Sequence, residues 1–153
     1  MKIEKSWVLA IAVVLAAVSL PVNRARADGD TRFQGEGCSK DSFKGSFGLT
    51  TTGAIVGVGD LAALGKITAD GKGNLVDGSF TQSLNGVISR GTFTGTYEVN
   101  PDCSGSATLN FASGATAHRD IVIVDDGREV RGISTDSGTV LTVNLKKQLP
   151  EDN

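Results

Sequence analysis

The sequence predicts an all-β protein: a single small antiparallel up-and-down barrel of about eight strands, with a β-sandwich as the alternative. Apolar and polar side chains alternate along most segments between residues 43 and 148, which is typical of a sheet with one buried and one wet face. Turn-forming residues recur between these segments, and no stretch shows a sustained helical period. The turn-forming stretches lie at 70–74, 85–86, 100–102, 125–127 and 136–138.

The N-terminus has the features of a secretory signal peptide. Two lysines precede a run of apolar and small residues from Trp7 to Leu20, and small residues again precede Asp28. The run is shorter than the roughly 20 residues that a helix needs to cross a bilayer. We therefore expect a signal-peptide helix over residues 1–27 that is cleaved, and export to a periplasm or to the extracellular medium. An uncleaved membrane anchor is the alternative.

Composition limits the partners of the predicted mature chain. Removal of the signal peptide leaves more acidic than basic residues, and the charges are scattered along the chain. This distribution argues against a nucleic-acid partner, which requires a concentrated basic face, and against an anionic membrane surface. We expect no membrane span after cleavage. The predicted order is a signal peptide at 1–27, an N-terminal segment at 28–42, a barrel domain at 43–148 and a flexible tail at 149–153.

The chain contains two cysteines, Cys38 and Cys103. In an exported protein an even number predicts a disulfide, here one that ties the N-terminal segment to the barrel; two free buried thiols are the alternative. Two cysteines and one histidine are too few for a closed zinc site. Asp70, Asn74 and Asp77 do not have the spacing of a calcium-binding loop. We expect no metal and no cofactor.

The strands follow from the alternation between the turns. Segment 75–84 places Val76, Phe80 and Gln82 on one face, and Asn85-Gly86 after it predicts a two-residue hairpin because both residues tolerate positive φ. Short connections make successive strands neighbours, and closure into a barrel removes the exposed edges. The predicted strands cover 43–51, 54–58, 62–69, 74–84, 87–99, 105–112, 117–125 and 128–135, with 138–147 as a possible ninth.

Two motifs resemble a known group of proteins. Residues 95–105 read GTYEVNPDCSG, and residues 70–74 upstream read DGKGN. Together they resemble a group of uncharacterised exported bacterial proteins that have a G-T-Y-x-V-N-P-D-C-x-G element after a D-G-x-G-N hairpin. The resemblance covers most of residues 38–147. It implies a bacterial periplasmic or extracellular barrel similar to allene-oxide-cyclase or lipocalin-like barrels. It implies no known activity, and no catalytic residue of allene oxide cyclases matches this chain.

The first functional hypothesis is a non-enzymatic barrel that binds a small apolar molecule in its interior. An eight-stranded barrel is just wide enough to hold one small ligand. In the alternative, the same inward side chains fill the core, and the protein has a structural role in the envelope. The ligand-binding candidates are Phe80, Phe93, Tyr97, Leu109 and Phe111.

The second hypothesis is an enzyme of the cyclase or isomerase type acting on a lipophilic substrate in the cavity. His118 is the only histidine, and on its predicted strand it shares a face with Asp120, which would orient the ring as in an acid–base pair. Tyr97 is the third catalytic candidate. A surface pair of His118 and Asp120 without a catalytic role is the alternative.

Overall fold

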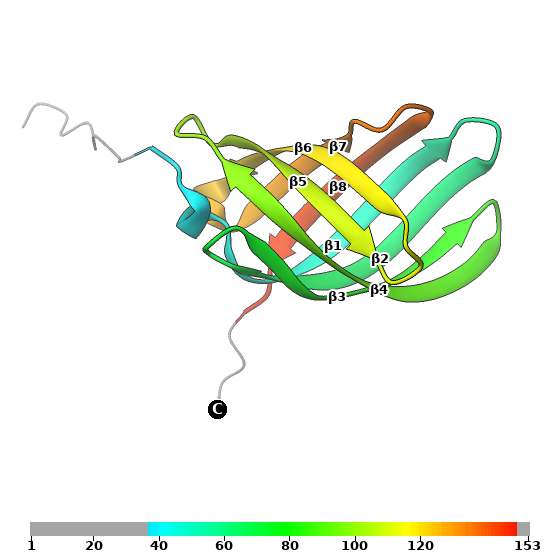
Figure 1. Ribbon diagram of the computed structural model, residues 1–153, viewed down its shortest axis with the longest axis horizontal. Coiled ribbons are helices and arrows are strands. Elements are labelled where there is room, and N and C mark those ends of the chain that lie inside the picture. Colours follow the sequence, from blue (N-terminus) through cyan, green and yellow to red (C-terminus); the bar gives the residue numbers. More distant parts are fainter. Residues whose placement is uncertain (1–36, 150–153) are drawn as a thin grey trace, which may run out of the picture. The chain divides into compact units, whose positions relative to one another are not determined.

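The computed structural model describes residues 37–149, and their strands form a closed antiparallel barrel (Figure 1). The eight strands pair in chain order, and β1 pairs with β8 to close the sheet. The predicted all-β up-and-down barrel is therefore confirmed, and the sandwich is excluded. The elements are η1 Lys40–Ser42, β1 Lys44–Ile55, β2 Gly59–Asp70, β3 Asn74–Leu84, β4 Val87–Val99, β5 Ser104–Phe111, β6 Thr116–Val124, η2 Asp125–Gly127, β7 Glu129–Ser134 and β8 Thr139–Lys147.

Some of the sequence predictions fall outside this part of the chain. The expected signal-peptide helix and its cleavage at 1–27 lie outside the described residues, as does most of the expected tail at 149–153. Within 37–149, no helix is long and apolar enough to cross a membrane.

The first strand is longer than the sequence predicts. Segments 43–51 and 54–58 are not separate strands: β1 runs without a break, and the chain turns at 56–58. Gly53 has a φ of 143° and lies so close to β8 that a Cβ would collide with the carbonyl of Val140. The glycine thus allows β1 to continue where the sequence suggests a break. The last predicted segment is therefore the eighth strand and not a ninth.

A β-bulge in β3 changes which side chains face inward. The register between β3 and β4 shifts just after Leu75, and Asp77 has a φ of 55°. The extra residue leaves both Val76 and Asp77 exposed, whereas Leu75 is buried. The prediction that Val76 shares a face with Phe80 and Gln82 is therefore wrong. Phe80 and Gln82 lie beyond the bulge and do face the interior, where both line a cavity.

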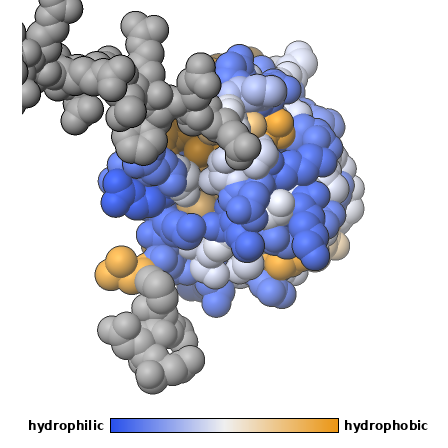
Figure 2. Space-filling model, turned by 90° about the vertical axis from the view of Figure 1, so that its left-hand side faces the viewer, coloured by the Kyte–Doolittle hydropathy of each residue, from blue (hydrophilic) through white to orange (hydrophobic). Residues whose placement is uncertain are grey.

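The turns lie at two ends of the barrel. We call the end with the β1–β2, β3–β4, β5–β6 and β7–β8 turns the mouth, and the end with η1 and the other turns the closed end (Figure 1). At the mouth, Asn85 and Gly86 have φ values of 48° and 84°, so they form the expected two-residue hairpin. Figure 2 looks toward the closed end, whose surface is mainly hydrophilic with small separate hydrophobic spots.

Aromatic side chains fill the closed end. Phe43, Phe47 and Tyr97 are each no more than 2% exposed, and the ring centroid of Phe43 lies 5.0 Å from that of Phe47 and 4.8 Å from that of Tyr97. The Tyr97 hydroxyl lies 2.7 Å from the carbonyl oxygen of Phe43 and 3.0 Å from that of Lys40. Burial raises the pKa of this phenol. Tyr97 therefore fastens η1 across this end.

A disulfide between Cys38 and Cys103 holds the N-terminal segment to the β4–β5 turn, as predicted. The Cys38 backbone N–H also donates to the carbonyl oxygen of Pro101 at 3.0 Å. Within the turn, Asp102 Oδ1 accepts a hydrogen bond from the Ser104 backbone N–H at 3.0 Å. The β4–β5 turn thus holds in place the N-terminal segment that covers the closed end.

Replacing both Cys38 and Cys103 by serine is expected to lower the free energy of unfolding by about 2–4 kcal/mol. The two cysteines are 65 positions apart, so the bridge removes much of the freedom of the unfolded chain. Urea denaturation of the oxidised protein and of the double variant measures the difference. Reduced wild-type protein should behave like the variant, and equal midpoints for oxidised and reduced protein would contradict the expectation.

One carboxylate organises the β2–β3 turn. Asp70 Oδ1 accepts hydrogen bonds from the backbone N–H groups of Lys72 at 2.7 Å and Asn74 at 2.9 Å, and Oδ2 accepts one from Asn74 Nδ2 at 2.7 Å. These bonds, led by the one from the Asn74 side chain, lower the pKa of Asp70 from 3.8 to about 2. They all favour the ionised carboxylate.

The folded state should therefore gain stability from ionised Asp70 above its ordinary pKa of 3.8 and lose that gain as the pH falls toward about 2. An NMR titration of the side-chain carboxyl carbon should give a pKa of about 2. Asp70→Asn should flatten the pH dependence of stability in the same interval. An unshifted titration of Asp70 is the result that argues against this account of the turn.

Candidate functional site

The interior of the barrel holds a cavity of about 490 Å³. Phe43 lines it toward the closed end, and at the mouth Ser113 and Thr116 both line the cavity and are exposed to solvent. Its volume lies within the range of roughly 300–1,000 Å³ found for small-molecule sites. Most of the wall is apolar, built from Phe43, Leu49, Ile55, Leu61, Ile67, Leu75, Phe80, Leu84, Phe93, Leu109, Phe111, Ile121, Val130, Leu141, Val143 and Leu145.

The cavity stays open because several inward positions have small side chains. Ala63 on β2, Ala107 on β5 and Ala117 on β6 line it, as does Ala115 in the β5–β6 turn. Protein interiors are normally packed to crystal-like density, so an unfilled space of this size departs from an ordinary barrel core. The interior of the barrel is therefore an open cavity and not a fully packed core.

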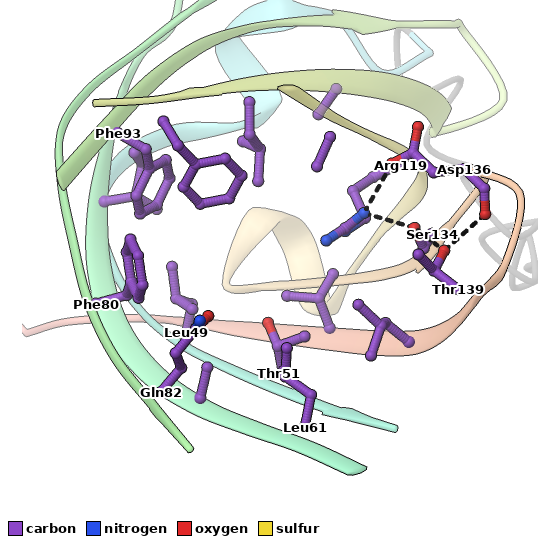
Figure 3. Close-up of a pocket in the computed structure, with 18 of the residues that line it drawn as sticks. Leu49, Thr51, Leu61, Phe80, Gln82, Phe93, Arg119, Ser134, Asp136 and Thr139 are labelled. Atoms are coloured by element: carbon purple, nitrogen blue, oxygen red, sulfur yellow. Dashed lines mark hydrogen bonds and ion pairs between the residues drawn. The ribbon is translucent and has the colours of Figure 1, made fainter. Parts of the chain in front are cut away.

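Three phenylalanines form one wall of the cavity. The ring centroid of Phe111 lies 5.5 Å from that of Phe80, at an interplanar angle of 86°, and 5.7 Å from that of Phe93. Figure 3 shows Phe80 and Phe93 on one side of the cavity, across from Arg119. With Leu109, these are four of the five ligand-binding candidates from the sequence, and all four line the cavity. Tyr97 does not, because it is part of the closed end.

The three catalytic candidates lie away from the cavity wall. Tyr97 packs under η1, and His118 and Asp120 lie together on the outer face of β6. The side chain of His118 is 54% exposed, and its Nδ1 pairs at 2.7 Å with Oδ1 of Asp136, not with Asp120. Residues two apart on a strand are separated by roughly 6.5 Å of rise, whereas the β7–β8 turn brings Asp136 directly beside His118. The predicted partner of His118 is therefore wrong.

The structure adds a residue that the sequence analysis missed, Arg119. It lies on β6, lines the cavity and is only 9% exposed. Its Nη1 donates to the backbone carbonyl of His118 at 2.9 Å and to Ser134 Oγ at 2.7 Å. No described residue accepts a hydrogen bond from its Nε or Nη2. Figure 3 shows the guanidinium projecting into the cavity.

Asp136 offsets the charge of Arg119 only in part. Its Oδ2 lies 3.7 Å from Nη1, beyond hydrogen-bond distance, and accepts instead from the backbone N–H of His118 at 2.8 Å. That bond and the one from the His118 side chain are the main causes of the lowered pKa of Asp136. Burial lowers the pKa of Arg119, and Asp136 opposes that effect. Arg119 and Asp136 are the two charged residues among those that line the cavity.

A signal for Arg119 is present in the sequence. Ile121 and Ile123 have the same parity on β6, both are buried, and Arg119 continues their face. When a charged residue falls on the buried face of a strand, either the predicted register is wrong or the side chain is buried because it has a function there. The candidates predicted from the sequence are inward apolar residues and the only histidine with its neighbours, so Arg119 is not among them.

The comparisons with known proteins add no relative. No family model, no curated protein and no solved structure matches this chain. The resemblance to exported bacterial barrels therefore stays a prediction. Among residues 37–149, no group of three or more His, Cys, Asp or Glu side chains is placed to hold a metal ion.

The two buried polar side chains should differ in their effect on stability. Tyr97→Phe removes the donor that serves the Phe43 carbonyl, and we expect a loss of about 1–3 kcal/mol in the free energy of unfolding. Arg119→Met loses two hydrogen bonds but also removes a desolvated charge, so we expect a change of less than about 1 kcal/mol. Urea denaturation measures both, and a larger loss for Arg119→Met than for Tyr97→Phe would assign Arg119 a structural role.

Proposed function

We propose that this chain is an exported barrel that binds a small, largely apolar molecule in its interior. The observation that supports the proposal is the cavity of about 490 Å³ with a mainly apolar wall. Apolar pockets of this size with a few well-placed polar groups are typical small-molecule sites. Burial of an apolar ligand in such a space is favourable by roughly 25 cal/mol per Å² of apolar surface removed from water.

The Cys38–Cys103 disulfide supports the export part of the proposal. Disulfides persist in oxidising compartments such as the bacterial periplasm and the extracellular medium, and they are rare in the cytosol. The signal peptide expected from the sequence points to the same compartments.

The two alternatives from the sequence have less support. A purely structural barrel would be expected to fill its interior, whereas alanines leave this one open. An enzyme of the cyclase or isomerase type would need acid–base groups at the cavity wall. Tyr97, His118 and Asp120 are not among the residues of that wall, and the carboxylate that is, Asp136, is engaged by hydrogen bonds with His118.

Filling part of the cavity should weaken binding. Ala63 lines the cavity on β2, and its neighbour Ala62 points outward and is exposed. We expect wild-type protein to bind the neutral fluorophore N-phenyl-1-naphthylamine, and Ala63→Trp to weaken that binding by at least about tenfold, because the indole occupies the space of the ligand. Fluorescence titration of the purified protein with its disulfide intact measures the affinity.

Ala62→Trp is the matched control, since it adds the same side chain to the outside of the same strand. Its affinity for the fluorophore should equal that of the wild type. Equal affinity for all three proteins would place the fluorophore outside the barrel, and absence of binding to the wild type would overturn the proposed function. Circular dichroism of each variant checks that the barrel is retained.

A further inference from the structure

One charged side chain, Arg119, is buried in the wall of a mainly apolar cavity, and part of its hydrogen-bonding capacity is unused. Arg119 is 9% exposed, and its two bonds both come from Nη1. A guanidinium has five N–H donors in a fixed plane, and those on Nε and Nη2 have no acceptor among the described residues. Nε and Nη2 thus leave one edge of the guanidinium available to a ligand inside the cavity.

The surrounding groups fix the position of this edge but do not satisfy it. Ser134 Oγ accepts from Nη1, and it lies 2.6 Å from Thr139 Oγ1, which in turn lies 2.7 Å from the backbone carbonyl oxygen of Asp136. This chain of contacts from β6 through β7 to β8 holds one side of the guanidinium in place. A donor held in one orientation before binding loses little conformational freedom on binding.

The available edge selects a planar anion with two acceptor atoms. Arginine matches a carboxylate through two parallel N–H···O bonds, and such charge-assisted bonds are among the strongest in proteins. Asp136 already contributes one negative charge 3.7 Å from Nη1. The charges of Arg119 and Asp136 cancel, so a bound monoanion adds one net negative charge to the site, whereas a doubly charged phosphate would add two and be repelled more strongly by Asp136.

The wall across from Arg119 indicates the chemistry of the rest of the ligand. Across from Arg119 lie the rings of Phe80 and Phe93 (Figure 3), and the ring of Phe111 packs against both. A molecule with its anionic group at Arg119 places its apolar part against these rings. We infer that the ligand is an apolar monocarboxylic acid whose carboxylate is held by Nε and Nη2 of Arg119. This inference rests on the proposed function and names the class of molecule that the cavity takes.

The test compares acids with neutral molecules of the same shape. Dodecanoic acid is paired with dodecan-1-ol, and 1-naphthaleneacetic acid with 1-naphthaleneacetamide, so that a chain and a ring system are both represented. Displacement of N-phenyl-1-naphthylamine from wild-type protein gives each affinity. In at least one pair we expect the acid to bind about tenfold or more tightly than its neutral partner, and the preferred pair identifies the apolar part of the ligand.

Arg119→Met should remove this preference while leaving the affinity for the neutral molecules within about threefold. Met keeps the length and apolar character of the arginine stem without its charge. Arg90→Met is the matched control, because Arg90 is exposed on the outside of β4, and it should keep the wild-type preference. Retention of the preference in Arg119→Met would overturn the assignment to this residue.

The outcomes separate the two proposals. If acids and neutral molecules bind the wild type equally, the cavity binds apolar molecules but the carboxylate inference is wrong. If neither class binds in the cavity, the proposed function itself is wrong. The comparison on wild-type protein uses no variant, so it decides the inference even if Arg119→Met does not fold.

Discussion

The pairing of β1 with β8 is the interaction on which the rest of the structure depends. All other strand pairs join neighbours along the chain through short turns, whereas this pair joins the two ends of the barrel domain, from Phe47 opposite Lys147 to Ile55 opposite Thr139. Without it the sheet would present two unpaired edges. The cavity also depends on it, because Leu49 of β1 and Leu145 of β8 both belong to the cavity wall. Closure therefore forms the fold and the candidate site in one step.

The two ends of the barrel differ: one is covered and the other is open, and this difference determines where the cavity lies. At the closed end, Tyr97 and the disulfide hold η1 and the segment before it against the barrel. The β6–β7 turn approaches the same segment so closely that a Cβ on Gly127, whose φ is 79°, would collide with the carbonyl of Ser42. Toward the mouth, the small side chains of Ala63, Ala115 and Ala117 leave part of the interior unfilled beside the phenylalanines, and this space opens to solvent.

The sequence predicts those features that depend on one strand at a time. Alternation and turn chemistry predict the all-β barrel and the Asn85-Gly86 hairpin, because both act over a few neighbouring residues. The outward position of Val76 arises from a bulge in the register with β4, and the pairing of His118 with Asp136 arises from a turn 18 residues further on. Such features require knowledge of which residues face each other across strands. The size of the cavity is harder still to predict from the sequence, because it depends on the volumes of the inward side chains of all the strands together.

Arg119 is the position where local rules and the global fold disagree. The alternation along β6 predicts apolar side chains on its inner face, and Ile121 and Ile123 are buried there. If stability were the only requirement, an apolar residue could replace this arginine at little cost in the free energy of unfolding. A buried ion pair often stabilises a protein no more than well-packed apolar residues in its place. The chain instead keeps the cation, anchors one side of it through Ser134 and leaves the other side facing an open cavity. Departures of this kind are expected at functional sites, where a local energetic cost is compensated when the ligand binds. The same reasoning explains why the mouth side of the barrel is not packed: an acceptor for Arg119 has to come from outside the chain, and the space beside Phe80, Phe93 and Phe111 is where the rest of that molecule lies.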